Sequence, residues 1–154
     1  MKTVAEAMTP LPEALDPDAG IRRAAQMMRD GDYGVVPLVD DQGVLVGVVT
    51  DRDIVVRAVA EGRDADTPVR HCMTDDPDTV AQDTPLEQAM TVMTARQVRR
   101  LPVVENGRLV GMLSLADIAV SAAPPDAKAQ VVESVSAGAG GDLSESTQTR
   151  LRNA

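Results

Sequence analysis

The sequence predicts an α+β fold of two tandem units, each with the element order β-α-β-β-α. Three observations support this prediction. The chain repeats itself, because Met8-Thr9 recurs as Met73-Thr74 and the run VGVVTDRDI recurs as VGMLSLADI. Each copy passes from a helical to a strand-like hydrophobic pattern, and short turn motifs separate the strand-like runs.

The first helix of each copy is predicted by apolar residues spaced i, i+3, i+4 and i+7, which share one helix face. These are Ile21, Ala24, Ala25 and Met28 in the first copy, and Leu86, Ala89, Met90 and Met93 in the second. Gly31 is expected to end the first of these helices. A short extended leading segment is expected ahead of each helix, at residues 9–17 and 74–82.

Two strands and a helix complete each copy. The runs VVPLV and LPVVE have the aliphatic composition of strands. The turns DDQG and ENG follow, and Asn106-Gly107 is a strong hairpin signal. The second strands, VLVGVVT and RLVGMLS, lead into helices expected at residues 51–61 and 115–122.

A two-stranded hairpin is marginal by itself, so the two units are expected to pack on each other. We predict a pseudo-two-fold pair around one shared core, with small mixed sheets and helices packed on them. The predicted organisation is unit 1 at residues 1–62, unit 2 at 63–123, a short helix at 124–136 and a disordered tail at 137–154.

Composition excludes several classes of function. The formal net charge of −9 argues against binding nucleic acid through its phosphates, although it does not exclude a small anionic ligand. A single Cys excludes an intrachain disulfide and a Cys-rich metal site. The sequence has no long apolar run and no signal-peptide pattern, so we expect a cytoplasmic protein with no membrane partner.

The repeated landmarks resemble those of cystathionine β-synthase (CBS) domains. They are an opening Met-Thr pair, a strand that contains proline, and the exit motif Gly-x-hydrophobic-Thr/Ser-x-x-Asp-hydrophobic. Both copies carry them in the same order, across residues 4–122. The two copies together look like a CBS pair, or Bateman module, of the short stand-alone kind.

This resemblance implies two clefts between the units that bind adenosine nucleotides such as AMP, ADP or ATP, or other adenosyl compounds. It implies that the motif hydroxyl approaches phosphate or ribose, that the aspartate binds the ribose hydroxyls, and that two pairs associate as a homodimer, a disc of four units. The expected ligand-binding residues are Thr50, Asp53, Ser114 and Asp117 in the exit motifs, and Val36, Pro37, Leu101, Pro102, Ala14, Leu15, Thr79 and Val80 around the base. For the last four, ordinary strand core is an equally good interpretation.

The exit motif has a second interpretation. Thr50 and Ser114 are suitable N-caps, and an acidic residue three positions later completes a capping box. The same geometry suits a ligand, because a helix N-terminus presents free N–H groups to phosphate and a carboxylate can accept two hydroxyls. We favour ligand binding because the motif is duplicated.

Three arginines are candidate phosphate ligands. Arg99 and Arg100 either lie on a solvated edge or contact phosphate through their guanidinium groups. Their counterparts in the first copy are Gly34 and Val35, so the two clefts are expected to differ, and the one near the arginine pair should prefer the more highly charged ligand. Arg52 is either exposed on the first helical turn or a phosphate contact.

No catalytic residue and no metal site is predicted. Adjacent side chains such as His71 and Cys72 diverge, so they are assigned a structural or surface role. The acidic cluster at residues 75–78 is interpreted as a solvated turn, which could hold Mg²⁺ only together with a nucleotide. No cofactor is expected to be required.

Three functions were weighed. The favoured one is a non-catalytic regulatory module that senses adenosine nucleotides and acts on a protein partner that the sequence does not identify. The alternative is a structural dimerisation or interaction module with one or both clefts non-functional. An enzyme is disfavoured, because neither a Walker-type loop nor a triad is present, and the barrel of IMP dehydrogenase, which carries a CBS pair, would need about 200 further residues.

Overall fold

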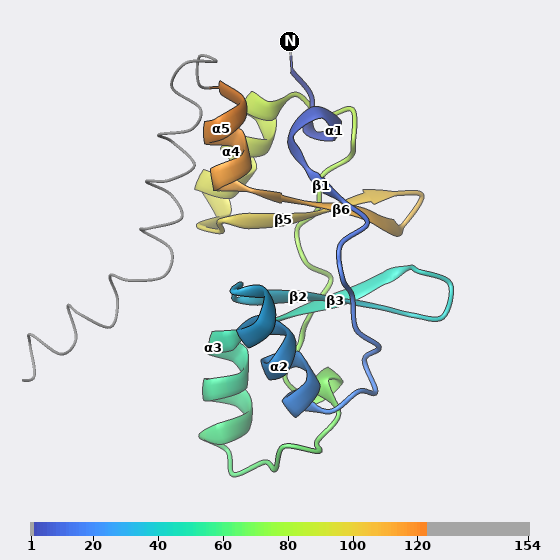
Figure 1. Cartoon of the computed structure of the whole chain (residues 1–154), viewed down its shortest axis with the longest axis vertical. Coiled ribbons are helices and arrows are strands. Elements are labelled where there is room, and N and C mark those ends of the chain that lie inside the picture. Colours follow the sequence, from blue (N-terminus) through green and yellow to red (C-terminus); the bar gives the residue numbers. More distant parts are fainter. Residues whose placement is uncertain (1, 123–154) are drawn as a thin grey trace, which may run out of the picture.

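The computed structural model describes residues 2–122, which form two units stacked along the long axis of the molecule (Figure 1). The first unit contains α2 (Ile21–Gly31), β2 (Val35–Val39), β3 (Leu45–Thr50), α3 (Asp51–Asp53) and its continuation η1 (Ile54–Val59). The second contains α4 (Leu86–Arg96), β5 (Arg100–Glu105), β6 (Arg108–Ser114) and α5 (Leu115–Ala122). The α+β class and the tandem repeat are confirmed. The helix and tail predicted at 124–136 and 137–154 lie outside the described residues.

The two long helices, α2 and α4, bury most of the predicted apolar face. In both copies the i, i+3 and i+7 positions are buried, but the i+4 positions, Ala25 and Met90, are exposed. Both helices end on a residue in the left-handed conformation, Asp32 at φ 54° and Gln97 at φ 56°. Gly31 is therefore the last residue of α2 and not the residue that terminates it.

Each unit has an antiparallel hairpin, β2 with β3 and β5 with β6, and each hairpin carries one register shift at the equivalent place. The hairpin turns require the positive φ of Gly43 (79°) and Gly107 (78°). The leading segments add a parallel bridge on the other side of β2 and β5, Leu15 to Leu38 and Val80 to Val103. The sheets are small, as the sequence predicts, but all their paired strands are antiparallel, and the parallel contacts are limited to these isolated bridges.

Four short elements connect the units by exchange. They are α1 (Val4–Ala7), β1 (Thr9–Pro10), η2 (Val69–His71) and β4 (Thr74–Asp75). Strand β1 pairs with β6 of the second unit, and β4 pairs with β3 of the first. Each short strand therefore belongs to the sheet of the other copy.

The exchange explains why the Met-Thr pair and the motif glycine occur together. Where β4 crosses β3, a Cβ on Gly47 would lie 2.8 Å from the Thr74 carbonyl oxygen and 2.9 Å from the Met73 sulfur. Where β1 crosses β6, a Cβ on Gly111 would lie 2.5 Å from the Met8 sulfur. Glycine is the residue that lets the two backbones approach this closely.

The buried side chains form two clusters and not the single shared core predicted from the sequence. Val4 packs in the cluster of the second unit, whereas Val69 and Cys72 pack in that of the first. Short segments of the predicted units 1–62 and 63–123 therefore pack in the hydrophobic cluster of the other unit. One core is replaced by two because each hairpin is covered by its own helices and by one segment exchanged from the other copy.

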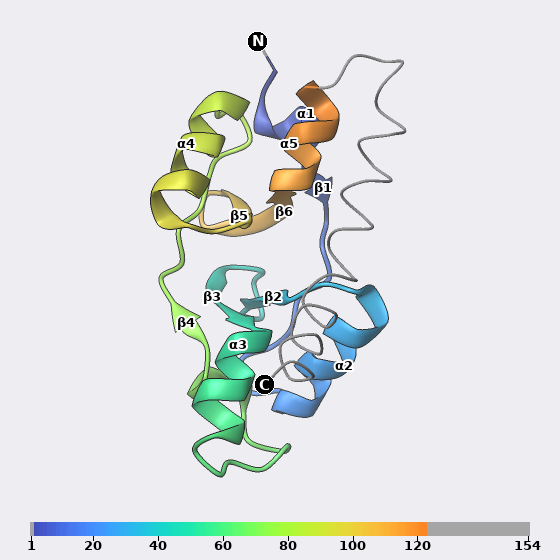
Figure 2. The same ribbon diagram turned by 90° about the vertical axis from the view of Figure 1, so that its left-hand side faces the viewer.

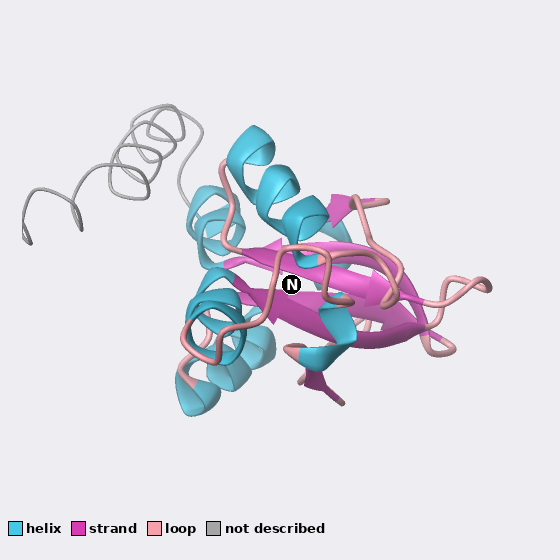
Figure 3. Cartoon of the chain, turned by 90° about the horizontal axis from the view of Figure 1, so that it is seen from below, coloured by secondary structure: helices cyan, strands magenta, loops and turns pink. Residues whose placement is uncertain are grey.

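The units also meet at their hairpin turns. The Leu45 amide donates to the Gly107 carbonyl and the Leu109 amide donates to the Gly43 carbonyl, each at 3.0 Å. Seen along the long axis, the strands run side by side, with the hairpin loops at one end and most of the helices towards the other (Figure 3). No helix within residues 2–122 is long and apolar enough to cross a membrane.

The two exit helices differ. The prediction for residues 115–122 matches α5, which is an ordinary α-helix. The helix expected at 51–61 instead begins as α3 and widens into the π-helical η1, in which the Ala60 amide donates to the Val55 carbonyl at 2.9 Å. The β-branched run Ile54-Val55-Val56 at this point is unfavourable to tight α-helical packing of side chains.

Candidate functional site

Both exit motifs form complete capping boxes. In the first, the Asp53 amide donates to Thr50 Oγ1 at 3.0 Å and the Thr50 amide donates to Asp53 Oδ2 at 2.9 Å. In the second, Ser114 and Asp117 make the same two bonds at 3.0 and 2.9 Å. The capping interpretation is therefore structurally correct in both copies, and each carboxylate uses only one oxygen to close its box.

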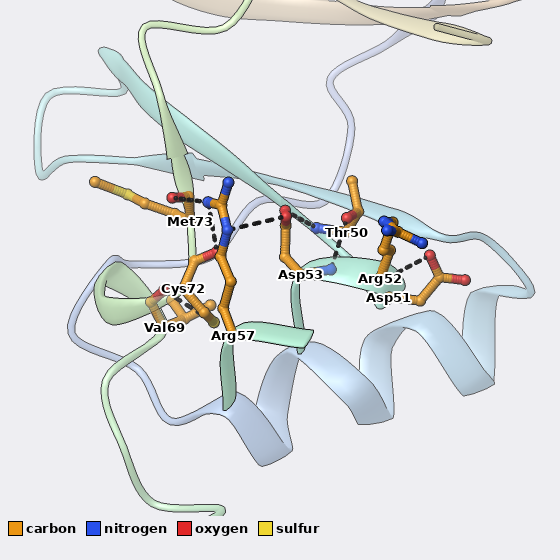
Figure 4. Close-up of polar contacts among 8 residues, drawn as sticks. All are labelled: Thr50, Asp51, Arg52, Asp53, Arg57, Val69, Cys72 and Met73. Carbon is orange, nitrogen blue, oxygen red and sulfur yellow. Dashed lines mark hydrogen bonds and ion pairs between the residues drawn. The ribbon is translucent and has the colours of Figure 1, made fainter. Parts of the chain in front are cut away.

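The remaining carboxylate oxygen distinguishes the two copies. Asp53 Oδ1 faces Nε of Arg57 at 3.8 Å, one helical turn later, and the Asp53 side chain is only 13% exposed (Figure 4). Among the described residues, Asp117 has no ion pair of this kind, and Ser121 stands where the first copy has Arg57. A carboxylate oxygen without a cationic partner has lone pairs available for the hydroxyl groups of a ligand.

The first helical turns also differ in charge. The first copy places Asp51 beside the motif, and its Oδ1 accepts the Arg52 amide at 2.9 Å. Arg52 itself is exposed, as one of its two predicted roles requires. In the second copy Leu115 and Ala116 occupy these positions, so the second helix start carries no acidic residue except Asp117.

The arginine pair lies next to the second exit motif. Arg100 is the register partner of Ser114, and the Leu115 amide donates to the Arg99 carbonyl at 2.8 Å. Both arginines are exposed. The backbone of both arginines therefore lies next to the helix start that lacks extra acidic residues, and positive charge there is favourable for an anionic ligand.

Tyr33, in the first unit, has a hydroxyl group in a charged environment. Burial raises the pKa of Tyr33, the Glu13 carboxylate raises it further, and the charges of Arg23 and Arg100 act in the opposite direction. The Tyr33 hydroxyl donates to Glu13 at 3.3 Å.

The residues expected around the base are brought together by the leading segments. The Leu15 amide donates to the Pro37 carbonyl at 3.0 Å, and the Val80 amide donates to the Pro102 carbonyl at 3.1 Å. The side chains of Val36, Leu101 and Val80 belong to the two hydrophobic clusters. Ala14 and Leu15 are half-buried and Thr79 is exposed. The packing of Val80 matches its interpretation as a core residue. Val36 and Leu101 are fully buried, so they could contact a ligand only through backbone groups.

The His71-Cys72 pair has the arrangement of structural residues. Cys72 is 1% exposed and burial raises the pKa of its thiol, which disfavours the nucleophilic thiolate. His71 is exposed. In the acidic cluster, Asp78 faces Arg96 at 3.4 Å. Across residues 2–122, no group of His, Cys, Asp and Glu side chains is suited to hold a metal ion.

Arg57 is the site residue that sequence reasoning missed. Its Nη1 donates to the carbonyls of Met73 at 3.1 Å and Cys72 at 3.5 Å, in addition to the ion pair with Asp53. The spacing Asp53 to Arg57, i to i+4, is a sequence signal for the ion pair. The contact with residues 72 and 73 has no such signal, because it depends on the exchange of the short strands.

Comparison with known proteins agrees with this architecture. The profile of the CBS domain family matches residues 4–59 and 69–123. The CBS domain-containing protein YhcV of Bacillus subtilis is 40% identical over 121 residues, 79% of this chain and 86% of YhcV. A crystal structure of CBSX2 in complex with AMP matches with a TM-score of 0.72 at 29% identity, over 79% of this chain and 96% of CBSX2.

A second solved structure carries other adenosyl ligands. The CBS domain pair of protein MJ0100, in complex with 5′-methylthioadenosine and S-adenosyl-L-methionine, matches with a TM-score of 0.69 at 26% identity, over 77% of this chain and 94% of that one. The internal repeat and the paired exit motifs are explained by the presence of two CBS domains in this chain. The chain belongs to the CBS domain family, and its two matched segments form a CBS pair.

Proposed function

We propose that this CBS pair is a non-catalytic regulatory module that binds adenosine nucleotides or related adenosyl compounds at its exit motifs. The observation that carries the proposal is the pair of capping boxes, in which Asp53 and Asp117 each keep one carboxylate oxygen outside the box. Such an oxygen can accept the hydroxyls of a ribose, and the adjacent helix start favours phosphate. Structures of related CBS pairs with AMP and with adenosyl compounds support this choice of ligand.

The second exit motif is proposed as the preferred site for a nucleotide with several phosphates. Arg99 and Arg100 lie beside it, and the first motif has neither of these cations. Guanidinium groups bind phosphate through two parallel hydrogen bonds. Mg²⁺ would bind only together with the nucleotide, since the described residues offer no metal site of their own.

We further propose that the active form is a homodimer. Exposed apolar side chains lie on three different helical segments: Val55 and Val59 on η1, Met90 on α4 and Leu115 on α5, at 40 to 67% exposure. Helices α2 to α5 share one side of the molecule, which Figure 2 turns towards the viewer. A surface of this kind is typical of an interface between subunits. A native mass of twice 16.2 kDa is expected, and the Val59→Asp variant should shift it towards the monomer.

Calorimetry tests the proposed ligand. The protein is titrated with AMP, ADP, ATP and S-adenosylmethionine, and we expect binding that the Asp117→Asn variant weakens. Asp41→Asn is the matched control, because it removes the same charge from an exposed residue of the first hairpin turn. Absence of both heat and thermal shift with every compound at millimolar concentration would contradict the proposal.

The alternative is a structural interaction module with non-functional sites. The capping boxes alone favour it, because they give Thr50, Asp53, Ser114 and Asp117 a complete structural role. The two proposals differ in one measurement. A structural module keeps its native mass and binds none of the compounds, whereas a sensor binds at least one.

A further inference from the structure

Arg57 occupies the part of the first site that a ligand would need. Its Nε lies 3.8 Å from Asp53 Oδ1, the oxygen that the capping box leaves over. Figure 4 shows Thr50, Asp53, Arg57 and Met73 in one connected row of polar contacts. The Asp53 side chain is only 13% exposed, so water has little access to replace the guanidinium beside its second carboxylate oxygen.

The guanidinium of Arg57 is held from two sides. While Nε faces Asp53, Nη1 donates to the Met73 carbonyl at 3.1 Å and approaches the Cys72 carbonyl at 3.5 Å. A planar guanidinium fixed by several acceptors loses little further freedom when it stays beside the carboxylate. The guanidinium is thus anchored by the segment that leads into the exchanged strand β4, while the Arg57 side chain remains 51% exposed.

Within residues 2–122, the second copy has no equivalent of this arrangement. Ser121 replaces Arg57, and the helix there is the α-helix α5 where the first copy has the π-helical η1. Π-helical turns are rare and occur often at functional sites. Arg57 and the local widening of the helix therefore occur together, in the copy that also lacks the arginine pair.

We propose that Arg57 is a specificity-determining residue that masks Asp53, so that adenosyl ligands bind more weakly at the first exit motif than at the second. This inference rests on the proposed function. For a ribose to bond Asp53 Oδ1, the guanidinium has to leave the carboxylate, and that displacement opposes binding at the first motif. Arg57 is a positioning residue in this scheme and makes no contact with the ligand.

The experiment uses a ligand without phosphate, so that removal of a positive charge does not itself weaken binding. Adenosine binding is measured by calorimetry in the full chain carrying Asp117→Asn, which isolates the first motif. Adding Arg57→Gln should tighten adenosine binding by about twofold to fivefold, the range expected for loss of an ion pair whose guanidinium side chain is 51% exposed. Arg63→Gln is the matched control, because it removes the same charge a short distance along the same segment and should leave binding unchanged.

Two further variants keep the test decisive. Arg57→Lys retains a cation near Asp53 and should bind adenosine as the parent does, even if Arg57→Gln loses stability through the Met73 carbonyl. Ser121→Arg introduces the mask into the second motif and should weaken adenosine binding in a chain carrying Asp53→Asn. The urea midpoint of each variant shows whether it is folded.

The outcomes separate this inference from the proposed function. Adenosine binding by the Asp117→Asn chain that Arg57→Gln leaves unchanged overturns the mask and leaves the proposed function standing. Weaker AMP binding with unchanged adenosine binding in Arg57→Gln identifies Arg57 as a phosphate ligand, which also overturns the mask. If the Asp117→Asn chain binds adenosine only after Arg57→Gln is added, the result supports a mask that blocks the first motif completely. If no variant binds adenosine, AMP or S-adenosylmethionine, both the mask and the proposed function are wrong.

Discussion

Substitution of Gly47 by alanine tests whether the exchanged strands hold the two units together. The new Cβ would lie 2.8 Å from the Thr74 carbonyl oxygen, whereas ordinary contacts begin at 3.4 Å. The carbonyl therefore has to retreat by about 0.6 Å, and in a close-packed structure such a shift is opposed by its neighbours. The register of β4 on β3, Val48 with Thr74 and Gly47 with Asp75, restricts this retreat.

The magnitude follows from two opposing effects. Overpacking against backbone costs about 2–3 kcal/mol, near the upper part of its usual range. Alanine regains about 0.5–1 kcal/mol relative to glycine in a strand, because it loses less conformational entropy on folding. The net loss for Gly47→Ala is about 1–2.5 kcal/mol of the free energy of unfolding.

Gly111→Ala provides the matched comparison from the other copy. Its Cβ would meet the flexible end of Met8 first, and the nearest backbone oxygen, that of Thr9, is 3.1 Å away. A methionine side chain can move aside, so overpacking costs about 1 kcal/mol and the entropy gain offsets most of it. We expect a net change near zero, and the same for Gly34→Ala, because the three atoms nearest to its Cβ belong to the side chain of Asp51.

Urea unfolding followed by far-ultraviolet circular dichroism is the suitable assay, because the chain has no Trp and only one Tyr. With a denaturant slope of about 2 kcal/mol per molar urea, Gly47→Ala should lower the midpoint by about 0.5–1.2 M relative to Gly111→Ala. Equal midpoints for the two variants, or a lower one for Gly111→Ala, would refute the reasoning from the crossing of β3 and β4.

Three further predictions concern the cores, the thiol and one carboxylate. Val49→Ala in the first cluster and Val103→Ala in the second should each lower the free energy of unfolding by about 1–3 kcal/mol. Because the clusters are separate, the two losses should add in the double variant. A double-variant loss in urea unfolding that differs strongly from this sum would indicate one core. Cys72, which is 1% exposed, should react with a thiol reagent only as the protein unfolds. The pKa of its thiol is raised in the folded state, so the folded protein keeps the thiol proton to a higher pH than the unfolded chain does. The contribution of the Cys72 thiol to the free energy of unfolding is therefore lost as the pH rises above the unfolded value near 9.0. Fast labelling of the folded protein would contradict that burial. The hydrogen bond from the Thr3 amide lowers the pKa of Glu6, so the Glu6 carboxylate stabilises the fold above its ordinary pKa of 4.5, and this stabilisation is lost as the pH falls through the lowered pKa. On acidification, the urea midpoint of the wild type should fall more than that of the Glu6→Gln variant. Equal falls would count against the Thr3 bond.

Much of the candidate site could be predicted because it is local in sequence. Thr50 and Asp53, like Ser114 and Asp117, are three residues apart, and a capping box needs only that spacing and a helix that starts there. The placement of Arg99 and Arg100 beside the second motif also follows from the hairpin, which sets Arg100 opposite Ser114. The roles of the buried strand residues were less accessible, because periodicity shows that Val36 and Leu101 are buried without showing what covers them.

The sequence by itself determined the repeat, the order of elements, the turns and the two capping boxes, because each depends on residues within a few positions of one another. The tertiary structure alone decided that β1 and β4 exchange between the copies, that two cores form in place of one, and that Arg57 reaches both Asp53 and the Met73 carbonyl. These features join residues far apart in the chain. A hydrophobic pattern specifies which face of an element is buried, but the partner on that face is selected only when the whole chain packs.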